Sequence, residues 1–216
     1  MPNPVPPRQT ISYLMQRFRE AGIRPRTKLG QNFLTDLNLV RLLVDAADVG
    51  PDDVVLEVGT GAGSVTAMVA PRAAAVVTVE LDATLFQLAG EELHALPNVR
   101  MLNVDALKNK NRVNAEVLAA VEAELAAGAG RRFKLVANLP YNVATPILTN
   151  LLSLERPPET MTVTIQKEVA DRLAAAPGTK DYGALSVWVQ SQCRVELVRT
   201  LPPSVFTTAP QSRRSN

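Results

Sequence analysis

The sequence predicts an α/β fold in which a mostly parallel sheet is flanked by helices. Short hydrophobic runs typical of buried strands occur at residues 53–58, 75–79, 99–104, 133–137 and 160–166. Segments of helical composition separate most of these runs. A glycine-rich loop directly follows the first run. Strand, glycine loop and helix in this order are typical of a nucleotide-binding βαβ unit.

The helices are predicted from apolar spacing and from their end signals. A helix over residues 10–21 places its apolar side chains on one face and ends at Gly22. The next helix, residues 37–47, takes its N-cap from Thr35 or Asp36. Further helices are expected at residues 64–70, 84–95, 113–127, 167–176 and 182–193, and one more strand at residues 195–201.

The glycine-rich loop has the sequence Gly59-Thr60-Gly61-Ala62-Gly63. Its spacing differs from the dinucleotide pattern Gly-x-Gly-x-x-Gly, and no Lys-Ser or Lys-Thr follows it, as a phosphate-cradling loop requires. Glycine lets the backbone approach a ligand closely, although tight turns use glycine too. The loop therefore indicates a nucleoside ligand without a pyrophosphate.

Acidic and amide residues end several of the predicted strands. Glu80 ends the second strand, where a carboxylate can bind ribose hydroxyls. Asp105 ends the third, within reach of an adenine amino group. Either residue alone would also fit an ordinary solvated charge. The residues at or beside strand carboxyl ends, where ligands bind in open α/β sheets, are Glu57, Gly59, Gly61, Glu80, Asp105 and Asn138. S-adenosylmethionine fits this set.

The tetrad Asn138-Leu139-Pro140-Tyr141 follows the strand at residues 133–137. The Asn138 oxygen can accept a hydrogen bond from an amino group. Pro140 restricts the turn and pushes Leu139 toward an extended conformation, so that the Leu139 carbonyl can point at the same amine. Tyr141 offers a ring for stacking. The tetrad suits a site that holds the exocyclic amine of a base, although an ordinary strand-to-turn connection with an Asn cap has the same composition.

Seven motifs occur in order along the chain. They are Lys28-x-Gly30-Gln31-Asn32-Phe33-Leu34, Glu57-Val58-Gly59-Thr60-Gly61, Val79-Glu80-Leu81-Asp82, Asp105-Ala106-Leu107, Asn138-Leu139-Pro140-Tyr141-Asn142, Gln166-Lys167-Glu168-Val169-Ala170-x-Arg172 and Tyr182-Gly183-x-Leu185-Ser186-Val187. Over roughly residues 24–206 the chain resembles the ribosomal RNA adenine N6,N6-dimethyltransferases of the kasugamycin-sensitivity type. The erythromycin-resistance methylases are related, but Asn142 and the Lys28-x-Gly30 lead-in resemble the housekeeping type more closely.

The resemblance implies a Rossmann-like, class I S-adenosylmethionine-dependent methyltransferase sheet. In it, Glu80 would bind the ribose of the cofactor and Asp105 its adenine, while the glycine loop would lie against the sulfonium end. The cofactor-binding residues implied by the resemblance are Gln31, Asn32, Leu34, Gly59, Gly61, Glu80, Asp105, Ala106 and Asn138.

The resemblance also implies a reaction, the dimethylation of N6 on adjacent adenosines in the 3′-terminal hairpin loop of small-subunit (16S) rRNA. The catalytic residues would be Asn138, Leu139, Tyr141 and Phe206, with the two rings stacking on the target base. Two alternatives stay open. One is a large-subunit (23S) rRNA adenine methylase of the macrolide-resistance type, and the other is a non-catalytic nucleic-acid-binding or ribosome-assembly factor on the same fold.

Charge and composition bear on the partners. The chain has 216 residues and a formal net charge of +2, which by itself implies little. Residues 1–30 carry six Lys or Arg residues and the single acid Glu20, so this segment can neutralise phosphates, unless it is simply a solvated tail. No apolar run is long enough to span a membrane, and no metal-ligand cluster is expected. We expect a cytoplasmic monomer whose partner is ribosomal RNA or a small-subunit precursor.

Three regions are predicted: an N-terminal arm and helix at residues 1–23, a methyltransferase domain at 24–206 and a tail at 207–216. In the relatives, the region around Phe206 continues into a last strand, antiparallel beside residues 195–201, and then into a small helical domain that helps to grip RNA. The tail does not match this pattern. We therefore expect the helical domain to be absent or truncated, and one edge of the sheet to stay open.

Overall fold

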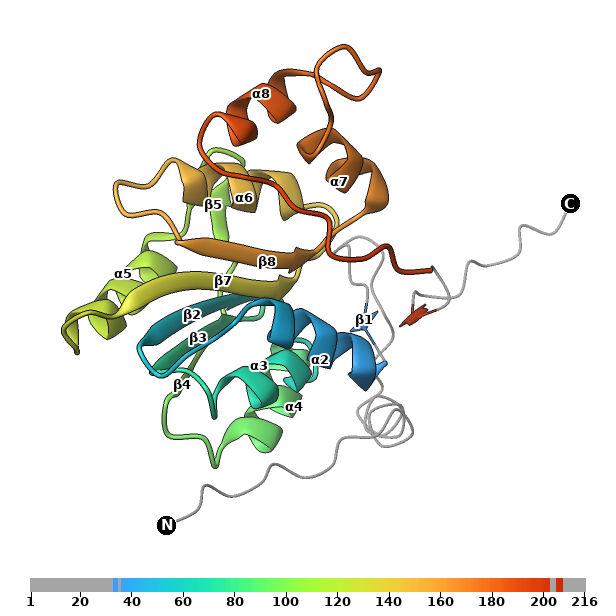
Figure 1. The fold of residues 1–216 in the computed structure, drawn as a ribbon. Helices are drawn as coiled ribbons and strands as arrows, with labels where there is room; N and C mark the ends of the chain where they lie inside the picture. Colours follow the sequence, from blue (N-terminus) through green and yellow to red (C-terminus); the bar gives the residue numbers. More distant parts are fainter. Residues whose placement is uncertain (1–32, 35, 203–204, 208–216) are drawn as a thin grey trace, which may run out of the picture.

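A five-stranded sheet forms the centre of the computed structural model, which describes residues 33–34, 36–202 and 205–207 (Figure 1). The strand order is β4-β3-β2-β7-β8, and every neighbouring pair is parallel. This confirms the predicted α/β fold. The strands are β2 (Asp53–Val58), β3 (Ala75–Val79), β4 (Val99–Leu102), β7 (Arg132–Asn138) and β8 (Thr160–Thr164).

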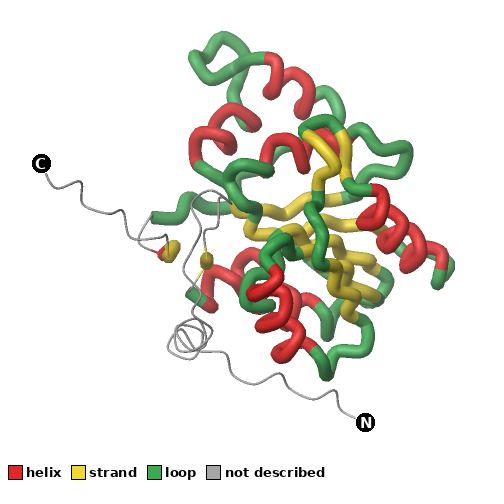
Figure 2. The backbone as a smooth tube through the Cα atoms, turned by 180° about the vertical axis from the view of Figure 1, so that it is seen from behind, coloured by secondary structure: helices red, strands yellow, loops and turns green. Residues whose placement is uncertain are grey.

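Helices cover both faces of the sheet (Figures 1 and 2). On one face, Leu56 of β2 belongs to the same buried cluster as Val121 of α5 and Ile147 of α6. On the other face, Val55 packs in a cluster with α2 and α3. Successive side chains of a strand point to opposite faces, so a strand buried on both sides is mostly apolar. The helices are α2 (Leu37–Ala46), α3 (Ser64–Val69), α4 (Ala83–Leu93), α5 (Ala115–Ala126), α6 (Ala144–Leu152), α7 (Lys167–Leu173) and α8 (Ala184–Gln190).

The helix starts follow local capping chemistry. Asp36 accepts a hydrogen bond from the backbone N–H of Asn38 at 2.9 Å and is the N-cap of α2, as predicted. Asp82 caps α4, and Asn114 caps α5 in the same way. Each such cap contributes about 1 kcal/mol to helix stability. Short polar side chains therefore set where the chain turns into a helix.

The strand order creates a crevice. From β2 the chain moves outward to β3 and β4, whereas β7 lies on the other side of β2 and leads to β8. The connections that leave β2 and β7 at their carboxyl ends therefore diverge. Ligands of open α/β sheets bind at such a switch point, which here lies between the loop after Val58 and the turn after Asn138.

Helices α7 and α8 form a pair beyond α6 (Figure 1). Ser186 of α8 is fully buried and donates a hydrogen bond to the carbonyl of Arg172. Gln190 donates to the carbonyls of Leu173 and Ala175 at 2.8 and 2.9 Å. These carbonyls lie at the C-terminus of α7, where helical partners are missing. The polar side chains of α8 thus fix the position of α7.

The predicted strand at residues 195–201 is wrong, because this segment is extended but pairs with no strand. Leu197 and Val198 are 58% and 60% exposed. A strand requires a neighbour for its backbone groups. Among the described residues, the only strand that pairs with β8 is β7. In the part of the chain that the structure describes, β8 is an edge strand of the sheet.

Two small antiparallel pairs were not predicted. One is a hairpin of β5 (Leu107–Asn109) and β6 (Arg112–Val113), and the other joins β1 (Phe33–Leu34) to β9 (Phe206–Thr207). Strands of two or three residues are too short to show a periodicity in the sequence. The predicted helix at residues 10–21 lies outside the described residues. No described helix has the length and apolar composition of a membrane span.

Candidate active site

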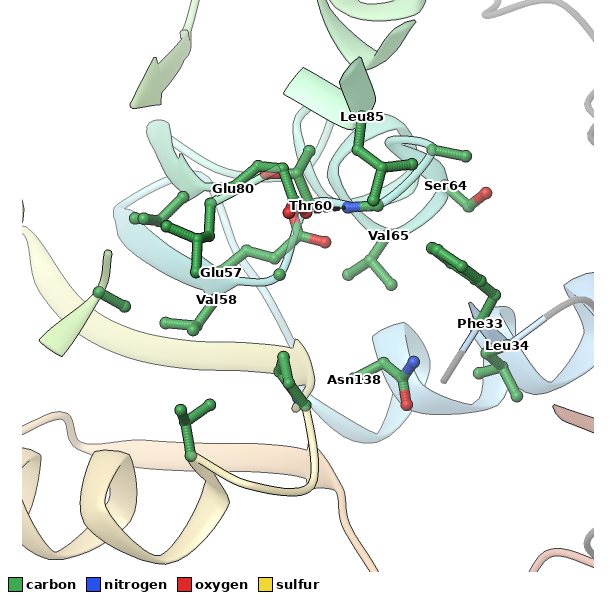
Figure 3. A pocket seen from close by; sticks show the side chains of 18 of the residues that line it. Phe33, Leu34, Glu57, Val58, Thr60, Ser64, Val65, Glu80, Leu85 and Asn138 are labelled. Carbon is green, nitrogen blue, oxygen red and sulfur yellow. Dashed lines mark hydrogen bonds between the residues drawn. The ribbon is translucent and has the colours of Figure 1, made fainter. Parts of the chain in front are cut away.

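A cavity of about 290 Å³ opens at the carboxyl end of the sheet (Figure 3). Its wall is formed by segments that are far apart in the sequence: β1, the loop after β2 and the ends of β3, β4 and β7. The sequence-predicted residues that line it are Leu34, Gly59, Gly61, Glu80, Asp105, Ala106 and Asn138. Gln31 and Asn32 lie outside the described residues. The structure therefore brings together the described residues predicted to bind the cofactor.

The glycine loop approaches the cavity with a backbone that favours glycine. Gly59 and Gly61 have φ angles of 87° and 57°, in the left-handed region. A Cβ atom on Gly59 would lie 3.3 Å from the ring of Pro140, which is closer than ordinary contact. A Cβ atom on Gly61 would lie 3.6 Å from the ring of Phe33. The loop thus packs directly against the turn after β7 and against β1.

Glu80 is held between two backbone donors. Its Oε2 accepts a hydrogen bond from Gly61 N–H, and its Oε1 accepts one from Asp82 N–H, both at 2.9 Å. Burial raises the pKa of this carboxyl above its ordinary value, against the lowering effect of the two backbone donors. Each carboxylate oxygen has more than one acceptor site. Glu80 can therefore accept further hydrogen bonds from two adjacent hydroxyl groups of a ligand bound in the cavity.

Asp105 and Ala106 offer a complementary pair of groups. The Asp105 Oδ1 atom accepts a hydrogen bond from the Leu107 N–H at 2.9 Å, whereas Oδ2 has no hydrogen-bond partner in the described part of the chain. Ala106 is buried, and its backbone N–H also has no partner among the described residues. One free acceptor beside one free donor matches the amino group and the adjacent ring nitrogen of adenine.

Glu57 was predicted to lie beside the ligand at a strand end, but the sequence assigned it no specific contact. It lines the cavity, is 1% exposed, and accepts hydrogen bonds from Thr66 and Thr78 at the same oxygen, Oε2. Because the Thr78 hydroxyl donates to Glu57, the Thr60 hydroxyl donates to Thr78 across 2.6 Å. Burial raises the pKa of Glu57 to about 8. An acidic residue inside an otherwise apolar strand was the available signal.

The other oxygen of Glu57 remains unsatisfied. Within the described part of the chain Oε1 takes part in no hydrogen bond, although the side chain is almost fully buried. Unpaired polar atoms in such surroundings are rare and often belong to ligand sites. Glu57 Oε1, Asp105 Oδ2 and the Ala106 N–H are therefore among the polar groups of the cavity that have no partner within the described residues. This is the pattern of a site built for a polar ligand.

The predicted catalytic residues differ in their position relative to the cavity. Asn138 is the last residue of β7, and its side chain lines the cavity (Figure 3). Leu139 is buried in the core, but its backbone carbonyl accepts no hydrogen bond from the described residues. Tyr141 is partly exposed just outside the wall, and Phe206 pairs in β9 with Leu34, which does line the cavity. The stacking roles of Tyr141 and Phe206 stay predictions.

Some lining residues were not predicted. Phe33, Val65, Leu85 and Val143 give the wall an apolar character between the polar groups, and the Ser64 side chain also lines it. Phe33 was visible in the first motif but received no role of its own. The described residues contain no cluster of three or more His, Cys, Asp or Glu side chains that could hold a metal ion. His94 is exposed at the end of α4 and does not line the cavity.

Comparison with known proteins agrees with this geometry. The family described as "Ribosomal RNA adenine dimethylase" matches residues 22–214. The "Ribosomal RNA small subunit methyltransferase A" of Alkaliphilus oremlandii is 45% identical over 85% of this chain and 61% of its own length. The protein of the same name from Geobacillus kaustophilus is 44% identical over 91% of this chain and 64% of its own length. The chain thus spans less than two thirds of these relatives.

Solved structures support the fold. A dimethyladenosine transferase from Plasmodium falciparum matches with a TM-score of 0.59 at 23% identity, over 73% of this chain and 52% of that one. The 23S rRNA methyltransferase ErmE matches with a TM-score of 0.52 at 26% identity, over 68% and 52%. The sheet is therefore that of a class I methyltransferase, and with the family match over residues 22–214, the chain belongs to the ribosomal RNA adenine dimethylase family.

Proposed function

We propose that this chain binds S-adenosylmethionine and transfers its methyl groups to N6 of adenosines in small-subunit ribosomal RNA. The observation that carries the proposal is the cavity in which Glu80, Asp105, Ala106 and Asn138 converge at the switch point of the sheet. Family membership supports the reaction type. The names of the two relatives that are 44–45% identical support the small subunit as the source of the RNA.

The polar groups of the cavity fit the cofactor. Glu80 would accept hydrogen bonds from the ribose hydroxyls, and Asp105 with the Ala106 N–H would recognise the adenine edge. The unpaired Glu57 Oε1 would accept a hydrogen bond from the amino group of the methionine portion. No lysine follows the glycine loop, which suits a ligand without phosphates. When bound, the cofactor supplies a methyl group on a positively charged sulfur.

The residues of the chain would then position the target amine. Adenine N6 is a poor nucleophile, because its lone pair is delocalised into the ring. Hydrogen bonds to the Asn138 side chain and the Leu139 carbonyl would draw the amine out of conjugation and direct its lone pair at the methyl carbon. The new N–C bond forms as the C–S bond breaks, and the amine proton then passes to solvent. Alignment of this kind can supply about 7–11 kcal/mol of barrier reduction.

The substrate base must leave its stack to reach the cavity, which lies at the carboxyl edge of the sheet. Tyr141, which is partly exposed and lies between the lining residues Pro140 and Asn142, would stack on the flipped base. The same reaction applied twice yields the dimethylated product. An enzyme of this kind would act in the cytoplasm on a precursor of the small subunit. The predicted monomer remains a prediction.

A large-subunit methylase is the second candidate, supported by the fold similarity to ErmE at 26% identity. The relatives named for the small subunit are more similar, at 44–45%. A non-catalytic binding factor is disfavoured by the polar groups gathered around the cavity. A binding factor needs no unpaired acceptors at the place where a methyl donor would lie.

The decisive experiment incubates the chain and a radiolabelled methyl donor with immature small subunits and, in a separate reaction, with large-subunit RNA. Each RNA is then digested to nucleosides. We expect label in N6,N6-dimethyladenosine of the small-subunit RNA. Label only in large-subunit RNA would support the second candidate, and methyl-donor uptake without any labelled RNA would support the binding factor.

We predict that Asn138→Ala lowers methyl transfer by at least about 100-fold, because the amine loses the acceptor that orients it. The fold should be unaffected, as judged by circular dichroism. Asn38→Ala, which removes an exposed amide on α2 that does not line the cavity, is the matched control and should retain activity. Full activity of the Asn138 variant would refute the assigned role.

A further inference from the structure

A short positively charged hairpin begins at the edge of the cavity. Strands β5 and β6 and the turn between them occupy residues 107–113, directly after the cavity residues Asp105 and Ala106. Residues 106–115 contain Lys108, Lys110 and Arg112 and no acidic residue. All three cations are exposed, and none forms an ion pair in the described part of the chain.

The base of the hairpin is fixed to the cavity wall. The backbone N–H of Asn114 donates to the carbonyl of Ala106, and its side chain donates to the carbonyl of Asp105, both at 2.9 Å. Val113 is 3% exposed and joins the core, and Leu107 packs against it. The hairpin is therefore rigidly attached to the residues that we assign to adenine recognition.

The tip of the hairpin is fixed as well. Asn150 of α6 donates a hydrogen bond to the carbonyl of Lys110 at 3.0 Å. Helix α6 begins a few residues after Asn138 and packs against β6. The hairpin thus lies between the cofactor end of the cavity and the helix that follows the target-base tetrad, and Figure 1 shows β5 beside α6.

A bulge determines how the cations are presented. Leu107 pairs with Val113 and Asn109 with Arg112, so Lys108 is an extra residue on β5. The inner pair packs on the core, whereas the outer pair and the tip are exposed. Bulges re-aim side chains in this way and are common next to active sites. The Asn109 side chain accepts a hydrogen bond from the Asn111 N–H and shapes the turn.

We propose that this hairpin binds the RNA substrate through backbone phosphates close to the nucleotide that enters the cavity. The proposal rests on the proposed function, since it requires an RNA substrate. Three unpaired cations on a fixed scaffold would neutralise phosphates without reading sequence. The strand rise of about 3.3 Å per residue keeps the tip within about 10 Å of Leu107, so the contacts would lie on RNA that reaches this wall of the cavity.

The test compares two triple variants with equal loss of charge. K108Q/K110Q/R112Q removes the hairpin cations. R41Q/R100Q/R156Q removes three exposed arginines from α2, β4 and the loop before β8. Affinity for a fluorescent RNA hairpin with two adjacent loop adenosines is measured by anisotropy between 50 and 200 mM KCl. Calorimetry measures the affinity of each variant for S-adenosylhomocysteine and so checks that its cavity is intact.

We expect the hairpin variant to lower the slope of log K against log salt by about 2, since each lost single-strand contact removes about 0.7. As KCl rises from 50 to 200 mM, the ratio of the Kd of the hairpin variant to the Kd of the parent chain should fall roughly 20-fold. The control variant should lose less than half as much slope. K108R/K110R, which keeps the charges, should retain the parent slope.

Other outcomes overturn the proposal in distinct ways. A hairpin variant with the parent slope overturns the hairpin assignment and leaves the proposed function standing. If the hairpin variant has the salt slope of the parent chain but co-sediments less with small subunits, the hairpin would contact a ribosomal protein. This result would also overturn the RNA assignment. A parent chain that binds S-adenosylhomocysteine but no RNA would overturn the proposed function, and this inference with it.

Discussion

At the scale of single residues, the cavity depends on a few buried polar groups. Glu57 is the most unusual, because it is almost fully buried and its hydrogen-bond partners are neutral hydroxyls rather than cations. A buried carboxyl in such surroundings keeps its proton to higher pH than in water. Its pKa of about 8 means that the group is mostly neutral at pH 7 when the cavity is empty of ligand.

The raised pKa predicts how Glu57 affects stability. Between its ordinary value of 4.5 and about 8, the unfolded chain loses this proton while the folded chain keeps it. The free energy of unfolding should therefore fall as pH rises through this window, by about 3 kcal/mol at pH 7. The Glu57→Gln variant lacks this titrating group. Its free energy of unfolding, measured with urea at pH 5 and pH 7.5, should therefore decrease less between the two pH values than that of the parent chain.

The control is Glu122→Gln, which changes an exposed carboxyl on α5 without hydrogen-bond partners in the described part of the chain. It should follow the pH dependence of the parent chain. If parent and Glu57→Gln lost equal stability between the two pH values, the buried acid would not be protonated in the folded state.

At the scale of elements, the opposite end of the sheet has its own polar cluster. Asp53 at the start of β2 is fully buried and contacts Lys134 Nζ at 3.0 Å and Arg132 Nε at 2.8 Å, both from β7. Lys134 also donates to the carbonyls of Ala47 and Asp48, just after α2. Burial opposes ionisation of Asp53, but the Gly50 N–H and these cations outweigh it and hold its pKa below the usual value.

We predict that Lys134→Met lowers the free energy of unfolding by about 3 kcal/mol, because a buried carboxylate and two carbonyls lose their partner. The double variant Asp53→Asn with Lys134→Met should recover part of this loss, since no buried carboxylate remains. Arg132, which also loses its ion pair with Asp53, is 44% exposed and can be solvated. Urea unfolding measures both. A single variant as stable as the parent chain would show that the cluster does not hold α2 to the sheet.

The Asp53 cluster also has a defined acid dependence. A carboxyl whose folded-state pKa is depressed stabilises the fold above its unfolded pKa and loses this contribution as pH falls through the folded value. The Asp53 contribution is therefore present at neutral pH and disappears in acid. Glu57 acts in the opposite sense, so the two ends of β2 bound a range of pH in which the sheet is most stable.

At the scale of the whole molecule, the cavity is assembled from segments separated by more than a hundred residues, from Phe33 to Val143. A ligand that bridges these segments stabilises the folded chain as a unit. At a concentration one hundred times its Kd, S-adenosylhomocysteine should add about 2.7 kcal/mol. For a chain of this size, Tm should rise by roughly 5–10 °C. Thermal unfolding followed by circular dichroism measures the shift.

The dependence of the Tm shift on the ligand tests which ligand the cavity recognises. ATP carries the same adenosine but three phosphates, for which the glycine loop offers no lysine. It should raise Tm much less than S-adenosylhomocysteine at equal concentration. Equal shifts would show that the cavity binds adenosine alone and does not recognise the amino-acid portion of the methyl donor.

The sequence by itself determined the elements and the polar residues at their ends. The β2, β3 and β7 strands were predicted as apolar runs because a strand buried on both faces is mostly apolar. Gly59, Glu80, Asp105 and Asn138 were predicted as neighbours because parallel strands bring their carboxyl ends to one edge. These conclusions rest on local patterns and on one general rule of topology, so they needed no knowledge of long-range contacts.

Only the tertiary structure decided which groups of the site have partners. The threonine network around Glu57, the unpaired Ala106 N–H and the hairpin anchored by Asn114 and Asn150 depend on distances between residues that no periodicity encodes. The strand wrongly predicted at residues 195–201 has the same cause. Apolar composition indicates that a segment can pair, but only the presence of a neighbouring backbone makes it a strand.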